Sequence, residues 1–553
     1  MDLYLDANAT TPVLPAAVEA AVVAMQQHFG NPSSAHAPGR AAQALLAQVR
    51  QTARRVLKVP EDGQLVFNSG ATEGLQTAVL SALVALRERR AAGDTRVQHL
   101  VVGATEHKAV PTALAHWNTL LGLHLPVLTW PVDSTGRHDL AWLRQHAPHA
   151  GLVCTMAANN ETGVVSDLDG IAAVLAQTSS PALWLVDAVQ ALGKLPLQLA
   201  RRPIDYATFS GHKLYAPKGV GLLYVRAGAP FTPLMVGGGQ EQGLRAGTEN
   251  LPGIAALGAV LQALEAADAE DAGHAGAASG GLHHADTLVA HRAQLVHTLR
   301  QAFPNVVFNA EPAHSLPTTL NLSLPGALGP LWMQALAAAG LQVSGGSACS
   351  AALGVAGSPV LAAMGLPAWQ VASAVRLSFG AADSAATIHE ACRRLQACGE
   401  SLQALQRAAS GGACKAPAPA DHSRPLHLSA EALPSLAATP HRLCLVDLRE
   451  AQEAEAGDAA LLRACLQGAH PNHEPADAVH LQAAPLSGLW QAPSALQAWL
   501  ALPAGQPLVF VCHSGQRSAR VAQLLRELGR PLSFSLAGGV AALRAQHADT
   551  ANV

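Results

Sequence analysis

A lysine and an aspartate each follow directly on a short apolar run, where a side chain can reach a bound molecule. Asp187 follows Leu-Trp-Leu-Val at 183–186, and Lys213 follows Phe-Ser-Gly-His at 209–212. Ligands of open α/β sheets collect at the carboxyl ends of the strands. A lysine among small neighbours there can bond to a carbonyl carbon, and a buried acid can keep a ring nitrogen protonated. The two residues therefore predict carbonyl chemistry assisted by an electron-withdrawing ring.

A turn suited to phosphate adds to this pattern. Residues 67–74, Phe-Asn-Ser-Gly-Ala-Thr-Glu-Gly, leave an apolar run through small residues and enter a helix whose apolar positions recur from Leu75 to Leu83. Free backbone N–H groups at the helix start, with the hydroxyls of Ser69 and Thr72, suit an anion. Taken alone, the segment is better interpreted as an ordinary capped helix. Beside the lysine and the aspartate, it predicts a site for pyridoxal 5′-phosphate (PLP).

Two of the eight cysteines lie in segments suited to a reactive thiol. Cys349 lies in Val-Ser-Gly-Gly-Ser-Ala-Cys-Ser at 343–350, where small residues impose little steric restraint, so we expect a mobile loop. A buried structural cysteine is the commonest alternative, but the polar, glycine-rich flanks argue against burial. Six further thiols lack such surroundings and are expected to be packing or surface residues: Cys154, Cys392, Cys398, Cys414, Cys444 and Cys465.

The second candidate thiol is Cys512. The segment Cys-His-Ser-Gly-Gln-Arg-Ser at 512–518 follows the apolar run Leu508–Val511 and precedes a helix with apolar residues on one face. A thiol at a helix N-terminus, with Arg517 returning toward it, is expected to have a depressed pKa and a pocket for negative charge.

From the motif Leu-Asp-Ala-Asn-Ala-Thr-Thr-Pro at 5–12 to about Leu405, the chain resembles a cysteine desulfurase of the class V aminotransferase family, in the group associated with nitrogenase and iron–sulfur assembly. Such a protein is a fold type I PLP enzyme. The resemblance implies conversion of L-cysteine to L-alanine, with the sulfur left as a persulfide on Cys349. It also implies that Arg376, in Ala-Val-Arg-Leu-Ser-Phe-Gly, clamps the substrate carboxylate.

The same resemblance implies the cofactor contacts. Lys213 holds PLP, His107 stacks on the ring and shuttles protons, and Asp187 faces the ring nitrogen. Thr248 comes from the partner subunit, which implies a homodimer. The remaining cofactor-binding residues implied are Ala71, Thr72, Asn160, Gln190, Ser210 and His212. Four positions depart from the usual pattern and leave turnover rate and acceptor choice open: Gln76, Gln242, Gly345 and Ala381.

The end of the chain resembles rhodanese through Val446-Asp447-Leu448-Arg449-Glu450, through Leu536-Ala537-Gly538-Gly539-Val540 and through its loop from Cys512 to Arg517. That loop has six residues, the sulfurtransferase length, whereas related phosphatases have one more. The interpretation is a relay that passes sulfur from Cys349 to Cys512 and on to an unknown acceptor protein. Two alternatives stay open: a rhodanese domain that only docks partners, and a selenocysteine lyase. A plain aminotransferase has no use for Cys349.

The elements that must position these residues predict an α/β fold: a large, mainly parallel-sheet domain with a small α+β domain, followed by an α/β rhodanese domain. We expect desulfurase residues 1–408 (large domain about 12–258, small domain 1–11 and 259–408), a linker at 409–425 and a rhodanese-like domain at 426–553. Ala266 to Ala285 is expected to be a flexible insertion. The expected strands of the large sheet are Leu65–Phe67, His99–Val102, Leu152–Met156, Leu183–Val186, Tyr206–Phe209 and Gly221–Val225.

Composition excludes several classes of protein. At 553 residues the chain is too long for one module, and its 35 basic and 38 acidic side chains nearly cancel, so no nucleic acid or membrane partner is indicated. No Cys-x-x-Cys pair occurs, and no metal site is expected. An acidic N-terminus unlike a signal peptide predicts a cytoplasmic protein.

Overall fold

The computed structural model describes residues 2–271, 281–325, 332–345, 357–411, 425–433, 436, 443–453, 458, 460–462, 479–485, 494–503, 505–527 and 530–551. Cys349, Cys414 and Cys465 lie outside the described residues.

Seven strands form the central sheet in the order β2-β8-β7-β6-β5-β3-β4. Neighbours from β7 to β4 pair in parallel, whereas β8 runs antiparallel to both β7 and β2. All six expected strands are present, and β4 is an additional one. The strands are β2 (Gln64–Asn68), β3 (His99–Gly103), β4 (Val127–Trp130), β5 (Ala150–Met156), β6 (Leu183–Asp187), β7 (Tyr206–Ser210) and β8 (Gly221–Val225).

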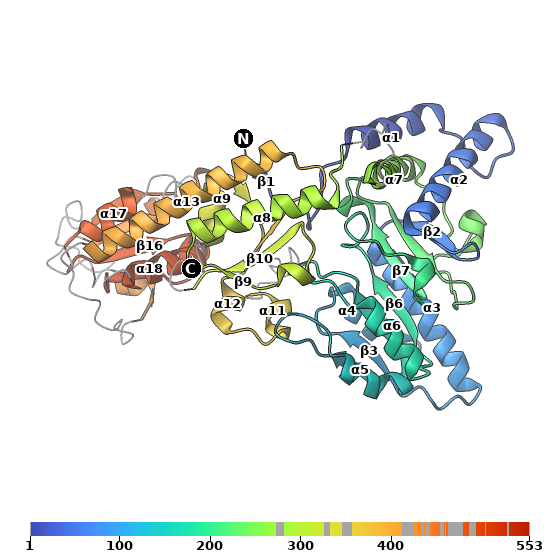
Figure 1. Ribbon diagram of the computed structural model, residues 1–553. Helices are drawn as coiled ribbons and strands as arrows, with labels where there is room; N and C mark the ends of the chain where they lie inside the picture. Colours follow the sequence, from blue (N-terminus) through green and yellow to red (C-terminus); the bar gives the residue numbers. More distant parts are fainter. Residues whose placement is uncertain are drawn as a thin grey trace.

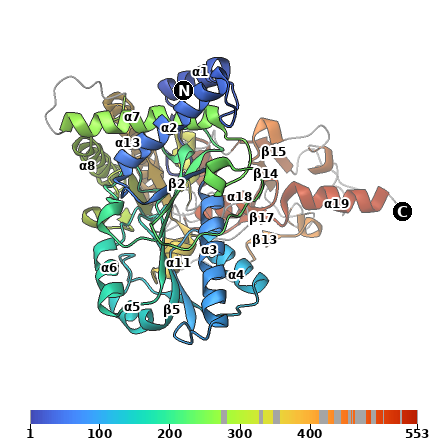
Figure 2. The same ribbon diagram turned by 90° about the vertical axis from the view of Figure 1, so that its right-hand side faces the viewer.

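Helices cover both faces of this sheet, so its inner strands β5 and β7 are buried along their whole length. Figure 2 shows α3 and α4 on one side of the strands and α5 and α6 on the other. Helices α1, α2 and α7 pack together beyond the edge that carries β2 (Figure 1). The helices are α1 (Pro15–Gln27), α2 (Ala37–Leu57), α3 (Ala71–Ala91), α4 (Ala109–Leu120), α5 (Leu140–His146), α6 (Leu168–Gln177) and α7 (Leu251–Asp271).

Within the described residues, the second unit contains two small sheets and five α-helices. One sheet is antiparallel in the order β12-β10-β9, and the other pairs β1 in parallel with β11, so the chain start joins this unit. The elements are β1 (Leu3–Tyr4), α8 (Ala285–Ala302), β9 (Val307–Phe308), β10 (Thr319–Ser323), α9 (Trp332–Ala338), β11 (Leu341–Gln342), α11 (Pro359–Ala363), α12 (Ala368–Ala372), β12 (Val375–Ser378) and α13 (Ala385–Gly411).

The C-terminal unit is a parallel five-stranded sheet in the order β13-β17-β16-β14-β15. Its described elements are β13 (His427–Leu428), β14 (Leu443–Asp447), β15 (Val479–Ala483), α17 (Ser494–Ala501), β16 (Leu508–Val511), α18 (Gln516–Glu527), β17 (Ser533–Leu536) and α19 (Gly539–Ala551). The order places β16, which precedes Cys512, inside the sheet.

Helix α13 connects the second and third units physically as well as in sequence. It lies beside α8 and reaches α17 of the C-terminal unit (Figure 1). Leu402 of α13 belongs to the same buried apolar cluster as Trp499 and Phe510, whose rings meet edge to face at 5.2 Å. A continuous core therefore holds the C-terminal unit against the rest of the chain.

Two helices extend further than the sequence pattern indicates. α7 continues to Asp271, into the expected insertion, and α13 continues to Gly411, past the expected start of the linker. The extension of α7 is rich in alanine, the residue with the highest helix propensity, which offsets the turn signals that follow it. The histidine at the insertion's end, His284, caps α8 by accepting a hydrogen bond from the N–H of Asp286.

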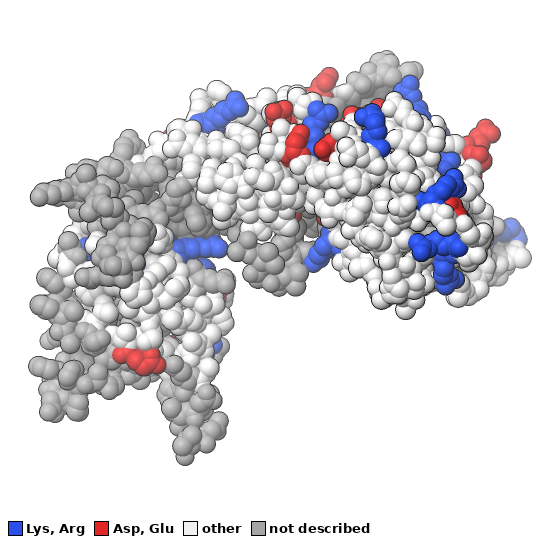
Figure 3. Space-filling view, turned by 90° about the horizontal axis from the view of Figure 1, so that it is seen from below, with Lys and Arg blue, Asp and Glu red and all other residues white. Residues whose placement is uncertain are grey.

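No helix within the described ranges is long and apolar enough to cross a membrane. Among those same residues, no group of three or more His, Cys, Asp or Glu side chains could hold a metal ion. The face seen in Figure 3 carries scattered charged side chains between wide uncharged areas, with neither sign gathered over a large part of it.

Candidate active site

The carboxyl edge of the central sheet brings together residues that are far apart in the sequence. Asp187 is the last residue of β6, Ser210 is the last of β7, and Lys213 ends the single helical turn Gly211–Lys213 that follows β7. The turn after β2 leads at the same edge into α3. Asp187, Ser210 and Lys213 therefore lie at one edge of the sheet, with the start of α3.

Lys213 is held by the N-terminal motif. Its Nζ donates hydrogen bonds to the carbonyl oxygens of Asn8 and Ala9, each at 2.6 Å. The backbone N–H and the hydroxyl of Thr11 donate to the carbonyl oxygen of His212, at 2.9 and 3.1 Å. The segment around Asn8 therefore closes over the lysine turn and fixes where the amine points.

Asp187 is buried at the floor of this edge. Its Oδ1 accepts the backbone N–H of Val189 at 3.0 Å. Burial raises its pKa to about 6, an effect that the Val189 N–H and the positive charge of Lys213 partly oppose. A buried carboxylate of this kind is stabilised by a cationic N–H, which is what a protonated pyridine nitrogen offers.

A second buried acid, Glu106, lies near Asp187. Its Oε1 accepts the backbone N–H of Met156 at 2.5 Å, while its Oε2 is buried with no hydrogen-bond partner among the described residues. Burial first, and then the charge of Asp187, raise the pKa of Glu106 well above its usual value. Burial and the neighbouring carboxylate of Asp187 therefore both favour the protonated form of Glu106.

The start of α3 has the features of a phosphate site. Gly70 precedes the helix with φ 147°, in the region that favours glycine, and no side chain caps the first turn. A Cβ built on Gly70 meets only the Ser210 hydroxyl, at 3.7 Å, so that hydroxyl lies against the turn. The carboxylate of Glu73 turns back to the N–H of Ser69 and to Arg245, each at 2.9 Å. Ala71 and Thr72 lie in the first turn, where N–H groups point out of the helix.

The two histidines of the site are neutral near pH 7. Burial, and then the charges of Lys213 and Lys108, lower the pKa of His107. Burial, and then Lys213 and Lys218, lower the pKa of His212 to about 4. The Nδ1 atom of His107 accepts the N–H of Ala109 at 3.3 Å, so the neutral ring carries its proton on Nε2.

Asn8 joins most of the polar groups of the site. It is buried, and its carbonyl oxygen also accepts the amide of Gln190 at 3.1 Å. Its side-chain oxygen accepts Lys194 at 3.1 Å, and its side-chain amide donates to Thr319 at 2.9 Å and to the carbonyl of Asn160 at 3.2 Å. Sequence reasoning placed Asn8 in a motif but assigned it no role, and it overlooked Lys194. The signal available was a polar residue flanked by alanines in that motif.

Arg376 is fully buried on β12 and points at the same site. Its Nη2 lies 2.6 Å from Asp6 Oδ1, and its Nη1 donates to the carbonyl of Asn160 at 2.9 Å. Its Nε has no hydrogen-bond partner within the described chain. The hydroxyl of Ser344 donates to the same oxygen of Asp6 at 2.9 Å, and Ser344 pairs with Arg376 through the backbone. The described chain therefore runs past Arg376 to Gly345, four residues before Cys349.

Thr248, which the resemblance assigns to the cofactor, makes no hydrogen bond or ion pair with the residues above within the described chain. It is exposed, in the segment that follows Arg245. That segment is anchored through Arg245 to Glu73 and through Glu241 to Arg50, at 2.9 and 2.7 Å.

Two of the residues that depart from the family pattern, Gln76 and Ala381, accept hydrogen bonds in the structure. Gln76 accepts the indole N–H of Trp117 at 2.6 Å. The carbonyl of Ala381 accepts the backbone N–H of His283 at 2.6 Å.

The second thiol, Cys512, lies between β16 and α18. It is buried, and its Sγ lies 3.4 Å from both the backbone nitrogen and the hydroxyl of Ser518. Arg517 makes a two-pronged ion pair with Glu453, at 2.7 and 2.9 Å. Sequence reasoning missed Glu453, which lies only three residues beyond the Val446–Glu450 motif.

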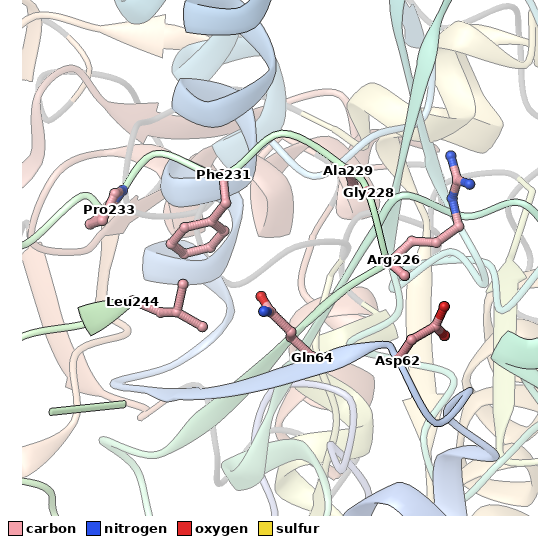
Figure 4. Close-up of a pocket in the computed structure, with 9 residues that line it drawn as sticks. Asp62, Gln64, Arg226, Gly228, Ala229, Phe231, Pro233 and Leu244 are labelled. Atoms are coloured by element: carbon pink, nitrogen blue, oxygen red, sulfur yellow. The ribbon is translucent and has the colours of Figure 1, made fainter. Parts of the chain in front are cut away.

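A separate surface cavity of about 430 Å³ lies away from these residues. It is lined by Asp62, Gln64, Arg226, Ala227, Gly228, Ala229, Phe231, Pro233 and Leu244 (Figure 4). Because β8 is antiparallel to β7, Arg226 lies at the amino end of β7, opposite Ser210 and Lys213. This cavity plays no part in the chemistry described above.

Comparisons with known families agree with both parts of the sequence interpretation. Residues 3–390 match the aminotransferase class-V family, and residues 429–546 match the rhodanese-like domain. The chain is 36% identical over 404 residues to a cysteine desulfurase of Cereibacter sphaeroides, covering 73% of this chain and 97% of the relative. It is 37% identical over 382 residues to a cysteine desulfurase of Gluconacetobacter diazotrophicus, covering 68% and 88%.

Solved structures give the same result for the first two units. A NifS-like protein superposes with a TM-score of 0.62 at 30% identity, covering 73% of this chain and all of that one. SspA in complex with cysteine superposes with a TM-score of 0.57 at 25% identity, covering 69% of this chain and all of that one.

Proposed function

The chain belongs to the class V aminotransferase family, as a PLP-dependent cysteine desulfurase with a C-terminal rhodanese-like domain, and from that membership we propose that it relays sulfur from L-cysteine through Cys349 to Cys512. We further propose that a homodimer carries out the reaction and that an acceptor protein takes the sulfur from Cys512. The individual residue roles below belong to the same proposal.

The residues at the sheet edge suit PLP. Lys213 offers its amine, Asp187 a buried acid for the ring nitrogen, and the open first turn of α3 with Ser210 offers a cradle for the phosphate. Bound PLP supplies an electron sink that weakens the bonds at the α-carbon of cysteine. His107 is neutral, so it can accept a proton and return it. Thr72, His212, Asn160 and Gln190 complete the binding of the cofactor.

Arg376 suits the substrate carboxylate. Asp6 and Asn160 hold its two terminal nitrogens, and its Nε has no partner within the described chain. A guanidinium fixed in this way can accept a carboxylate without first being ordered. The carboxylate of cysteine would then place the thiol on the side from which the Gly345 segment arrives.

Cys349 is proposed as the acceptor of the first sulfur. Gly345 precedes it by four residues, which in extended chain span at most about 14 Å. The thiolate of Cys349 attacks the substrate sulfur, a sulfur–sulfur bond forms and the carbon–sulfur bond breaks. The electron pair of the broken bond stays with the β-carbon of the substrate, which is protonated as alanine forms, and bound PLP would supply the electron sink that makes this cleavage possible.

The second transfer is proposed to occur at Cys512. Its thiolate attacks the outer sulfur of the Cys349 persulfide, the new sulfur–sulfur bond forms on Cys512, and Cys349 leaves as a thiolate. The observation that carries this proposal is Cys512 Sγ facing the Ser518 N–H at a helix start, beside an arginine held in place by Glu453. The shared core around Leu402 and Trp499 keeps this loop attached to the desulfurase.

The test uses the full-length holoenzyme with ³⁵S-cysteine. Cys512→Ala should form alanine at the wild-type rate, carry label on Cys349 only and deliver less sulfur to the acceptor. Cys349→Ala should carry no label at either thiol. The matched control is Cys444→Ala, a buried thiol in the same domain whose pKa burial raises to about 11, and it should behave as wild type. Unchanged sulfur delivery by Cys512→Ala would contradict the relay.

A further inference from the structure

A second lysine lies in the cofactor site. Lys194 Nζ donates to Gln190 Oε1 at 2.7 Å and to Asn8 Oδ1 at 3.1 Å. Asn8 also accepts Lys213 on its backbone carbonyl, so one asparagine connects the two amines. We propose that Lys194 is a positioning residue of the PLP site, which fixes the orientation of the Gln190 amide and places positive charge beside Lys213.

The local backbone explains why Lys194 points inward. Gly193 has φ 73°, and a Cβ built on it would lie 2.5 Å from the side chain of Leu214 and 3.1 Å from that of Leu264. Only glycine fits this approach of the turn to the lysine strand end. The turn thereby delivers Lys194 to the site from β6, the strand that also supplies Asp187.

The hydrogen bond to Lys194 determines which way the oxygen and the NH₂ group of the Gln190 amide face. Lys194 Nζ donates to Gln190 Oε1, and the ammonium form of a lysine has no acceptor, so it favours the oxygen of the Gln190 amide on this side. The NH₂ group then faces the opposite way, where it donates to the carbonyl of Asn8 at 3.1 Å. That carbonyl also receives Lys213, so Lys194 aims the Gln190 donor at the place where the cofactor is attached. This step rests on the proposed role of Gln190 in binding PLP.

Charge gives Lys194 its second effect. Its ammonium end lies inside the site, and burial, followed by the charges of Lys213 and Arg376, lowers its pKa to about 7. The effect between the two lysines is mutual: positive charge on Lys194 disfavours the ammonium form of Lys213, and only the neutral amine attacks an aldehyde. The other titratable groups that face Lys213 are Asp187, His107 and His212.

The test separates orientation from charge in the apoenzyme, with PLP itself as the probe. Lys194→Met removes both, Lys194→Gln keeps N–H donors without charge, and Lys58→Met removes an exposed lysine outside the site as the control. Dissociation constants and attachment rates are followed by PLP absorbance from pH 6 to 9. We expect Lys194→Met to bind PLP about fivefold to tenfold more weakly and to raise the pH midpoint of attachment by about half a unit or more.

Further comparisons decide each part. Lys194→Gln should recover most of the affinity but keep the raised midpoint, and Lys58→Met should match wild type. Because Lys194 acts through Gln190, the double variant with Gln190→Leu should bind PLP no more weakly than Gln190→Leu alone. Wild-type affinity and midpoint in both Lys194 variants, or additive losses in the double variant, would overturn the inference.

An unaffected Gln190→Leu protein would instead refute the proposed role of Gln190. If Lys194→Met does not fold, the Lys194→Gln midpoint alone decides the charge effect.

Discussion

The amine of Lys213 lies 2.6 Å from the backbone carbonyl of Asn8, a residue 205 positions earlier in the chain. This contact joins the N-terminal motif to the turn that follows β7. Strand β1, just before this motif, belongs to the second unit. The segment from Asp6 to Thr11 therefore connects the second unit to the large domain. The segment supplies carbonyl acceptors to the site at the junction of the two units.

Asn8→Ala should weaken PLP binding and lower stability. The substitution removes the side-chain hydrogen bonds to Lys194, Thr319 and the Asn160 carbonyl but leaves the backbone acceptor of Lys213 in place. We expect a loss of about 1–3 kcal/mol in the free energy of unfolding, because buried partners lose their bonds. Urea unfolding and PLP titration of the apoenzyme measure both effects.

The matched control for this variant is Asn118→Ala. Asn118 is buried and bonded to both backbone groups of Leu125 but lies on α4, outside the site. It should lower stability and leave the affinity for PLP unchanged. Equal PLP affinity in the two variants would show that Asn8 has only a general structural role.

Asp187→Asn should change how the stability of the apoenzyme depends on pH. The pKa of Asp187 is about 6 in the folded protein and about 4 when unfolded, so the folded state binds the proton more tightly. Its contribution to stability is therefore present below pH 4 and is lost as pH rises through 6. We expect Asp187→Asn to remove a decline on the order of 2 kcal/mol between pH 4 and 7, measured by urea unfolding. An identical pH profile for both proteins would show that the carboxyl ionises normally.

Arg376→Lys should raise KM for cysteine about tenfold or more while leaving PLP affinity near wild type. A lysine keeps the charge facing Asp6 but loses the planar fork that can bind a carboxylate through two parallel hydrogen bonds. Steady-state alanine formation measures the effect. Arg394→Lys is the control, since Arg394 is bonded to Glu390 and the Gly340 carbonyl on the far side of the small unit. A large fall in kcat with unchanged KM would place Arg376 in a different role.

Glu453→Gln should impair the second sulfur transfer without affecting alanine formation. The variant loses the ion pair that fixes the Arg517 side chain beside the Cys512 loop. We expect the rate of label transfer from Cys349 to Cys512 to fall about fivefold to twentyfold, because charge-assisted hydrogen bonds of this kind contribute about 1–2 kcal/mol. Rapid-quench labelling follows the transfer.

Glu390→Gln serves as the control, because it removes a carboxylate that forms the same kind of ion pair, with Arg393 and Arg394 on α13. It should transfer sulfur at close to the wild-type rate. A transfer rate in Glu453→Gln equal to that of Glu390→Gln would mean that Arg517 needs no support.

The interior strands could be predicted from sequence because their burial is complete. β5 and β7 are buried at every residue, and runs of that kind indicate a parallel sheet covered on both faces. β4, at the edge of the sheet, was missed. Its four residues, Val127 to Trp130, lie between two prolines, and three of them are exposed or half-buried, as suits an edge strand.

The independence of the C-terminal domain could not be judged from the linker. Low periodicity after Ser410 indicates a break between units, but it carries no information about which surfaces meet. Leu402 and Trp499 are ordinary apolar residues in their own helices, and their membership of one core depends on how α13 and α17 pack.

The amino-acid sequence by itself determined the α/β class, the position of Lys213 and Asp187 at strand ends, and the presence of two cysteines in loop motifs. These features are local, because strand patterns, turn residues and motif spacing are properties of neighbouring residues. Only the tertiary structure decided that Asn8 connects Lys213, Gln190 and Lys194, that Glu106 lies beside Asp187, and that Glu453 holds Arg517. Hydrogen bonds and pKa shifts between residues distant in sequence depend on distances that exist only after the chain has folded.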